Sequence, residues 1–273
     1  MTYIFDGKGF AVNKQSKLVN EVAILKQKKI CPKLVSILVG DDVASHLYVN
    51  LKKQAAERVG MEMDIRYLKS DIKKESLITL LADLNNDKSV QGIMIQLPLP
   101  EHFSKEDRDE ILKKIAREKD VDGLQEDSIF LTPTVKAVLE VFKVASEQAG
   151  QLVSNEQNLK IVVVGSKGFE GKKIYTVLQE MGYETEGIDR RTENLKQKTA
   201  SADILISVTG SPGIIGRDEV KDGSIIIDVG SPKGDVKTEE VVGKAAFLSP
   251  VPGGVGPVTI SCLLENLVEA SSK

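Results

Sequence analysis

The amino-acid sequence predicts two α/β domains, each built on a parallel β-sheet that helices cover on both faces. Segments with strand patterns alternate with helical segments almost from end to end. Most of the expected strands are continuous apolar runs, which is typical of parallel strands buried on both faces. The chain has 273 residues, 41% of them hydrophobic, which is enough for two medium-sized cores.

The first half of the chain contains three expected strands separated by helices. A helix is expected over Lys14–Gln27, and the apolar run KLVSILVG (33–40) has the length of a strand. Asp41 or Asp42 can cap the next helix, and Gly60 suits its end. The remaining elements are a strand in 61–68, a helix in 73–86, a buried strand in 90–100, and helices over Lys105–Glu118 and Val135–Ala149.

The second half begins after SEQAGQLVSNEQN (146–158), which has the composition of a linker. Helical segments separate the first three of its strands, which again favours a parallel sheet. A cleft between the two domains is the expected ligand site. The expected strands are Ile161–Val164, Glu184–Ile188, Ile204–Val208 and Ser224–Val229.

Composition argues against several classes of partner. The net charge is −3, aromatic residues make up 4% and tryptophan is absent, so neither nucleic acid nor an anionic membrane is expected to bind. The two cysteines and two histidines show no metal-ligand spacing, and no metal site is expected. Without a secretion signal or a membrane-length apolar run, we expect a soluble cytoplasmic protein.

The segment VVVGSKGFEGKKI (162–174) is a buried strand pattern followed by a glycine-rich turn and a helix. Such a turn is typical of a Rossmann-type dinucleotide-binding domain, where the pyrophosphate lies on the helix N-terminus. Ser166, Gly168 and Gly171 fit the template, with serine in the first position. An acidic residue is expected about 20 residues later, and Asp189 lies there. A strand-to-helix corner whose glycines only assist packing is the alternative.

Residues around this turn give opposite indications about the cofactor. Asp189 favours NAD, because a carboxylate accepts a hydrogen bond from a ribose hydroxyl. Lys167, Arg190 and Arg191 favour NADP, because they can neutralise its 2′-phosphate. The simpler alternative is that these three basic side chains are solvated and bind no ligand.

Polar residues at four places in the chain are candidates for a substrate site. Tyr48 and Lys52 are four residues apart on one helix and therefore share a face. Gln96 ends a strand, where side chains reach the crevice of a parallel sheet. Asp122, in the turn KDVDG, either caps locally or binds a ligand. The loop PGGVGP (252–257) is a hinge or a point of close backbone approach.

Taken in order, LVGDDVASHLYVNLK, QLPLP, KDVDG, IDVG and PVPGGVGPVT closely resemble one family. It is the bifunctional methylenetetrahydrofolate dehydrogenase/methenyltetrahydrofolate cyclohydrolase family, and the resemblance spans about residues 35–260. It implies a folate domain over 1–138, completed by the last helix at 256–273, and a Rossmann-type cofactor domain over 139–255. It also implies a homodimer that acts on tetrahydrofolate derivatives in one-carbon metabolism, with NADP as cofactor and NAD as the alternative.

The resemblance also implies roles for individual residues. Lys52 would be the catalytic lysine, with Gln96 hydrogen-bonded near it, while Tyr48 stacks on the folate and Asp122 holds the pterin ring. Pro252, Gly253 and Gly254 would line the cleft where folate and nicotinamide meet. The cofactor would contact Gly165, Ser166, Lys167, Gly168, Gly171, Asp189, Arg190 and Arg191.

The implied reactions make different demands on the protein. Hydride removal from a carbon between two nitrogens needs alignment with the nicotinamide more than it needs an acid or a base. Hydrolysis of the resulting methenyl group needs a proton acceptor, and a lysine serves only if its pKa is lowered. We therefore expect Lys52 to serve mainly the hydrolytic step.

Two segments depart from the family pattern. The loop after Asp122 is shortened to LQEDSIFLTPTVKAV, and the cofactor turn lacks the usual arginine and gains Glu170. These differences leave two alternatives open. One is a cyclohydrolase with weak or lost dehydrogenase activity, and the other is a non-catalytic folate- or nucleotide-binding relative.

Overall fold

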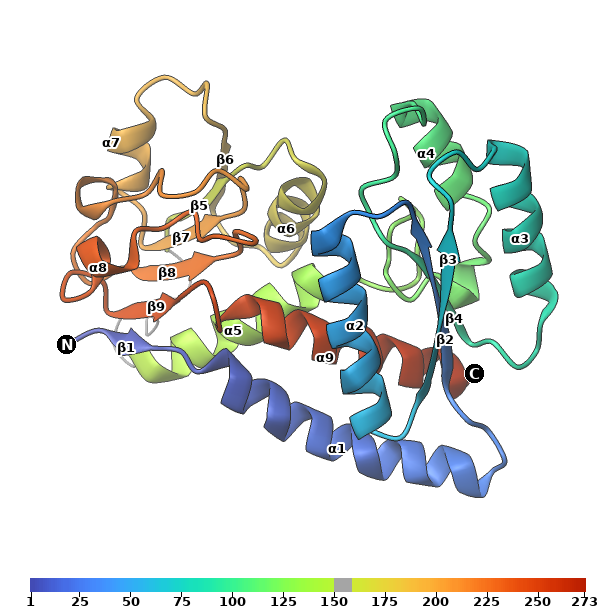
Figure 1. Ribbon diagram of the computed structural model, residues 1–273. Helices are drawn as coiled ribbons and strands as arrows, with labels where there is room; N and C mark the ends of the chain where they lie inside the picture. The colour runs from blue at the N-terminus through green and yellow to red at the C-terminus, as the bar shows by residue number, and fades with distance from the viewer. Residues whose placement is uncertain (150–158) are drawn as a thin grey trace. The chain divides into compact units, whose positions relative to one another are not determined.

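The computed structural model describes residues 1–149 and 159–273 (Figure 1). They form two compact units, one of Met1–Ala11 and Thr134–Thr259, the other of Val12–Pro133 and Ile260–Lys273. The second part of the predicted linker, residues 150–158, lies outside the described residues.

Both units are α/β folds with parallel sheets, as the sequence predicts. The compact units group residues 1–11 with the second sheet, whereas the sequence analysis assigns them to the folate domain. The physical reason is a short strand, β1 (Tyr3–Ile4), which pairs in parallel with β9 (Phe247–Ser249). Neither of these strands is apparent from the sequence pattern, because each spans only two or three residues.

The unit Val12–Pro133 with Ile260–Lys273 contains a three-stranded parallel sheet in the order β3-β2-β4. The chain leaves β2 toward one neighbour and then returns to the other, so the topological switch point lies between β2 and β4. Its strands are β2 (Lys33–Val39), β3 (Glu62–Leu68) and β4 (Gly92–Ile95). Its helices, two of which extend beyond it, are α1 (Gly7–Gln27), α2 (Val43–Arg58), α3 (Lys74–Asn86), α4 (Lys105–Leu112) and α9 (Val255–Ser271).

Strand β2 is buried on both faces. Leu34 and Leu38 pack into a cluster with residues of α1, α2 and α9. Val35, Ile37 and Val39 point the other way and pack against residues of α3 and α4. This division follows the two-residue repeat of a strand and explains why KLVSILV is apolar without alternation.

Two helices differ from the expected boundaries. Helix α1 begins at Gly7 instead of Lys14, and the Asp6 carboxylate accepts a hydrogen bond from the Gly9 N–H at this end. The predicted helix over Lys105–Glu118 is wrong in its second half, because α4 ends at Leu112. There the Asn85 side chain of α3 donates to the carbonyl of Lys114 and accepts from the N–H of Ala116, which replaces helical hydrogen bonds.

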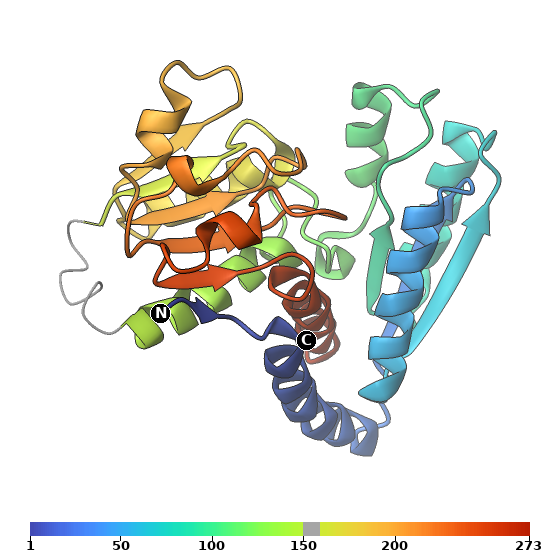
Figure 2. The same cartoon turned by 60° about the vertical axis from the view of Figure 1, so that its left-hand side comes forward.

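The other unit contains a six-stranded parallel sheet in the order β1-β9-β8-β7-β5-β6 (Figures 1 and 2). After β6 the chain crosses to the opposite side of β5, so the switch point lies between β5 and β7. Open parallel sheets bind ligands at such a point, beyond the carboxyl ends of the strands. The remaining strands are β5 (Ile161–Val164), β6 (Thr185–Ile188), β7 (Ile204–Ser207) and β8 (Ile225–Asp228). The helices are α5 (Pro133–Ala149), α6 (Phe169–Glu180), α7 (Leu195–Thr199) and α8 (Thr238–Val241).

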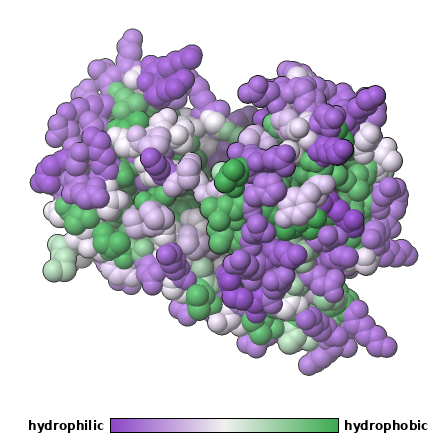
Figure 3. All heavy atoms as spheres, viewed as in Figure 1, coloured by the Kyte–Doolittle hydropathy of each residue, from purple (hydrophilic) through white to green (hydrophobic). Residues whose placement is uncertain are grey.

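Hydrophilic residues cover much of the face seen in Figure 3. Within 1–149 and 159–273, none of the helices is long and apolar enough to cross a bilayer.

Candidate active site

Lys52 lies on α2, and its amine contacts the end of β4. The Asp42 carboxylate caps the helix by accepting a 2.7 Å hydrogen bond from the Ser45 N–H, which settles the choice between Asp41 and Asp42. The Lys52 Nζ donates to the Gln96 Oε1 at 3.1 Å. The Met94 Sδ lies 3.9 Å from the same nitrogen. The amine is therefore held at the switch point of this sheet.

Gln96 has a fixed orientation. It follows β4 directly, and its own N–H donates to the carbonyl of Ile37 at 2.8 Å. Its Nε2 donates to the carbonyl of Leu97 at 2.9 Å, so the amide presents its oxygen to Lys52. Met94 was missed by the sequence analysis, although the two-residue repeat of a strand puts it on the same face as Gln96.

The surroundings of Lys52 favour the neutral amine. Removal from water lowers the pKa of Lys52, and the nearby Asp122 carboxylate opposes this effect by raising it. Gln96 orients the amine without adding charge. A lysine whose pKa is lowered can accept a proton near neutral pH, which an ordinary surface lysine cannot.

Asp122 lies in a tightly folded turn whose capping is provided by its neighbour Asp120. The Asp120 carboxylate is buried and accepts hydrogen bonds from the N–H groups of Leu124 and Gln125, at 3.2 and 3.1 Å. Burial raises the pKa of Asp120. Gly123 has a φ of 63°, which closes the turn. The sequence analysis overlooked Asp120, although Asp is a frequent turn-capping residue.

The glycines of the turn after β5 are required by the backbone. Gly165 has a φ of 93°, and a side-chain Cβ there would lie 2.6 Å from the carbonyl oxygen of Val208 at the end of β7. A Cβ on Gly171 would overlap the carbonyl oxygen of Gly165. Gly168 is the N-cap of α6. The tight turn is thus made at Gly165, one residue before the Ser166 that the sequence template puts first.

Charged residues from the ends of β5 and β6 meet beside this turn. The Lys167 Nζ lies 2.5 Å from the Asp189 carboxylate, which also accepts from the Arg191 N–H at 2.7 Å. The Lys167 contact lowers the pKa of Asp189. Ser166 donates from its Oγ to the carbonyl of Ile188 at 3.3 Å, and Arg190 is exposed. A helix N-terminus with a carboxylate and cations nearby matches the diphosphate and ribose of a dinucleotide.

The loop at 252–254 connects β9 to α9. Gly253 has a φ of 99°, and a Cβ on Gly254 would overlap the Ser249 Oγ and the carbonyl oxygen of Pro250. Pro252 is exposed. Both glycines are therefore needed for the path of the backbone. The structure brings Lys52 and Gln96 together in one unit, and Lys167 and Asp189 together in the other.

Comparison with known proteins finds a matching family model for each half of the chain. The catalytic domain of tetrahydrofolate dehydrogenase/cyclohydrolase matches residues 5–122, and the NAD(P)-binding domain of the same enzymes matches residues 132–273. The bifunctional protein FolD of Brevibacillus brevis is 38% identical over 287 residues, which cover 99% of this chain and 97% of that protein.

Solved structures agree with this assignment. The FolD structure from Campylobacter jejuni has a TM-score of 0.91 and 35% identity, with 100% of this chain and 99% of that chain covered. The Trypanosoma brucei enzyme, solved with NADP and an inhibitor, has a TM-score of 0.90 and 29% identity, with 99% and 97% covered. The predicted family and two-domain α/β fold are confirmed. This chain belongs to the tetrahydrofolate dehydrogenase/cyclohydrolase family and carries both its catalytic domain and its NAD(P)-binding domain.

Proposed function

We propose that the protein oxidises methylenetetrahydrofolate to methenyltetrahydrofolate with NADP, and then hydrolyses the product to formyltetrahydrofolate. These reactions interconvert the one-carbon units used in purine and amino-acid biosynthesis. The observation that carries the proposal is the environment of the Lys52 amine. Burial lowers the pKa of Lys52, and its Nζ donates a hydrogen bond to the Gln96 Oε1 at 3.1 Å.

In the oxidative step, the residues of this chain hold the substrate in place. Bound NADP supplies the hydride acceptor. We assign Tyr48 to stacking on the folate and Asp122 to hydrogen bonding with the pterin ring. We assign Pro252, Gly253 and Gly254 to the wall near the nicotinamide. The two nitrogens of the substrate stabilise the developing cation, so alignment contributes more than proton transfer.

In the hydrolytic step, Lys52 acts as the proton carrier. Water adds to the methenyl carbon, and the neutral amine takes the proton that this oxygen loses. The ammonium then returns this proton to the ring nitrogen as its C–N bond breaks. The remaining proton of the added oxygen passes to solvent as the C=O bond forms, which leaves the formyl group on the other nitrogen. Gln96 keeps the amine directed at the reacting carbon, and the cationic substrate favours the neutral form of Lys52.

We assign the cofactor to the turn after β5. Gly165, Ser166, Gly168 and Gly171 allow the pyrophosphate to approach the start of α6. We assign Asp189 to the ribose. The three cations assigned to the 2′-phosphate are Lys167, Arg190 and Arg191.

Two observations favour a second candidate function, a cyclohydrolase with weak dehydrogenase activity. Asp189 and Lys167 already form an ion pair, which a bound cofactor has to rearrange. Glu170, in the first turn of α6, adds negative charge where a diphosphate would bind. A non-catalytic folate-binding protein is less well supported, because binding alone does not require an amine with a lowered pKa.

We further propose a cytoplasmic homodimer. Apolar side chains are exposed on α2 and on the edge strand β3, namely Val43, Leu47 and Tyr67. A contact between copies would cover such a surface. Neither Cys31 nor Cys262 forms a disulfide, which fits a reducing compartment.

The decisive experiment follows the two steps separately, with NADP and with NAD. We expect Lys52→Met to reduce the kcat of methenyl hydrolysis by about 100- to 10,000-fold, the range for loss of a general base, while hydride transfer falls less. Lys53→Met removes the neighbouring amine and serves as the control. Unchanged hydrolysis in Lys52→Met overturns the role of Lys52. Hydrolysis without reduction of either cofactor in the unaltered protein favours the second candidate.

A further inference from the structure

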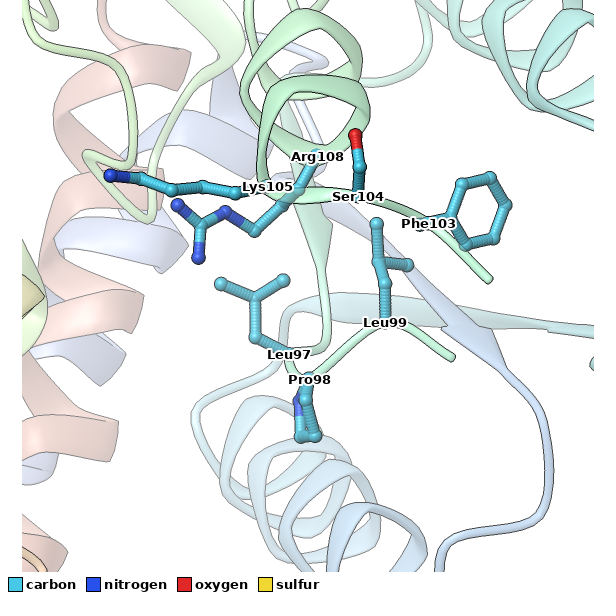
Figure 4. A pocket seen from close by; sticks show the side chains of 7 residues that line it. All are labelled: Leu97, Pro98, Leu99, Phe103, Ser104, Lys105 and Arg108. Atoms are coloured by element: carbon cyan, nitrogen blue, oxygen red, sulfur yellow. The ribbon is translucent and has the colours of Figure 1, made fainter. Parts of the chain in front are cut away.

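Gln96 and Asp122 both act on the Lys52 amine, and they are held in different ways. Gln96 directly follows β4, and the segment after it lines a pocket of about 480 Å³ with residues 103–105 and Arg108 (Figure 4). Asp122 lies instead in the turn after the short 3₁₀ helix Arg117–Lys119, outside the segments that line this pocket. The position of the Asp122 carboxylate therefore depends on what holds that turn.

Asn266 on α9 holds this turn at two points. Its Nδ2 donates to the carbonyl of Val121 at 2.8 Å and to the carbonyl of Leu131 at 3.0 Å. An amide nitrogen carries two N–H donors, so each carbonyl receives one of them. The two hydrogen bonds join residues 145 and 135 positions apart. One side chain near the end of the chain thus fixes both ends of the segment 121–131.

These hydrogen bonds are formed inside an apolar core. Asn266 is fully buried. Burying an amide is unfavourable unless its donors are paired, and a backbone carbonyl outside helices and strands also needs a donor. The Asn266 side chain and the turn therefore satisfy each other. Val121 packs in one cluster with three leucines of α9, namely Leu263, Leu264 and Leu267.

The contact with Val121 bears directly on Asp122. The Val121 carbonyl belongs to the planar peptide group that ends in the Asp122 nitrogen, so holding this oxygen also sets the start of Asp122. On the other side of the turn, the Lys119 amine donates to three carbonyls at the end of α3. Asp122 lies between these two attachments, and only the one from Asn266 reaches its own peptide group among the printed contacts of residues 119 and 266.

We propose that Asn266 is a positioning residue of the active site, which fixes the Asp122 carboxylate beside Lys52 through the Val121–Asp122 peptide group. This inference rests on the proposed function, in which Asp122 also holds the pterin ring. Met94 and Gln96, which contact the Lys52 amine, are uncharged, and Asp122 is the charged group that raises its pKa. When Asn266 no longer holds the turn, Asp122 moves away from the amine and raises this pKa less.

The test follows the pKa of Lys52 in the protein without substrate, from the pH titration of its ¹³Cε resonance, which is assigned by its absence from Lys52→Met. Leucine keeps the branched shape of asparagine but has no N–H donor, so we expect Asn266→Leu to move the midpoint downward. Asp122→Asn moves it downward as well. The double variant has the midpoint of Asp122→Asn alone, because Asn266 acts through that carboxylate.

Ser261→Ala is the matched control on the same helix. It removes a buried hydroxyl that accepts from the Gln15 Nε2 of α1 at 3.0 Å, and it leaves the midpoint in place. Asn266→Ser retains one donor and replaces the leucine variant if that variant does not fold; its midpoint moves in the same direction by less. A midpoint in the Asn266 variants equal to that of Ser261→Ala, or fully additive shifts in the double variant, overturn the proposal.

Ligand binding gives a second measurement. By calorimetry, Asn266→Leu should raise the Kd for tetrahydrofolate roughly tenfold, as for loss of one hydrogen bond to a charged group, while Ser261→Ala keeps it. An unchanged Kd in Asn266→Leu contradicts the positioning of Asp122 for the pterin. If the midpoint moves as expected in a protein that does not hydrolyse methenyltetrahydrofolate, the proposed function fails and the role of Asn266 stands. Hydrolysis with an unmoved midpoint means the reverse.

Discussion

Replacing Gln96 by glutamate tests the proton-carrier role of Lys52 without removing the amine. Glutamate has almost the same shape as glutamine and puts a negative charge where the amide oxygen now lies, 3.1 Å from the Lys52 Nζ. An opposite charge at this distance favours the ammonium form. The variant should therefore raise the pKa of Lys52, against the effect of burial that lowers it in the unaltered protein.

The strength of the attraction between the introduced carboxylate and the Lys52 ammonium follows from their distance. With an effective dielectric constant of about 20, the attraction between unit charges at 3.1 Å is roughly 5 kcal/mol. The amine is removed from water but part of the Lys52 side chain remains exposed, so solvent screening reduces this value. We expect the pKa of Lys52 to rise, as for opposite charges in close contact, and hydrolysis at neutral pH to fall by roughly 10- to 1000-fold.

The assay is the pH dependence of kcat for methenyl hydrolysis. Because the neutral amine is the active form, the rate increases with pH through the pKa of Lys52, and Gln96→Glu moves this midpoint upward. Gln54→Glu, on the exposed side of α2, adds the same charge and leaves the midpoint in place. Asp122→Asn moves it downward, because the carboxylate that raises the pKa is gone. A midpoint in Gln96→Glu equal to that of Gln54→Glu would refute Lys52 as the proton acceptor.

Three more changes have defined outcomes. The buried Lys119 amine donates to the carbonyls of Leu84, Asn85 and Asp87 at 2.7–2.9 Å, so Lys119→Met should lower the free energy of unfolding in urea by about 2–4 kcal/mol. A loss no larger than that of the exposed Lys88→Met would contradict this role. Gly171→Ala forces a methyl group onto the Gly165 carbonyl and should abolish cofactor binding in fluorescence titration. Gly182→Ala also strains the backbone, at a φ of 87°, but its methyl group has nothing within 4 Å, so this control retains binding. Lys167→Gln should raise the Kd for NADP several-fold more than the Kd for NAD, and equal changes would exclude a phosphate contact.

Much of the fold was predictable because both sheets are parallel and covered. Such strands are apolar throughout, and β5 (Ile161–Val164) has the bounds that its sequence pattern predicts. The missed strand β9 depends on its pairing with β8, and β1 depends on its pairing with β9, neither of which a local pattern reveals. The end of α4 depends on the Asn85 side chain of another helix, so helical periodicity alone extends it too far.

The sequence predicts on which helix face or strand end the candidate site residues lie, but it does not predict which of them are in contact. Helical spacing puts Tyr48 and Lys52 on one face, and the strand end places Gln96 in the crevice. The contact between Lys52 and Gln96 joins residues 44 positions apart, and it requires the chain to return from β3 through α3 and pair β4 with the other side of β2. Only the structure shows that burial lowers the pKa of Lys52, since this depends on atoms from several elements.

The altered glycine turn changes the charges around the cofactor more than the path of the backbone. Gly165 and Gly171 meet the steric requirements of a tight strand-to-helix turn, so Lys167 and Glu170 fit between them without disturbing it. We expect the Lys167–Asp189 ion pair to affect the binding of NAD and of NADP differently. The ribose hydroxyl of NAD can donate to Asp189 while Lys167 stays in place. The phosphate of NADP has to draw Lys167 away from Asp189 and tolerate that carboxylate, although two further cations, Arg190 and Arg191, lie next in the chain. We therefore expect the preference between cofactors to depend on this balance of charge, and the binding of either cofactor to depend on the glycines.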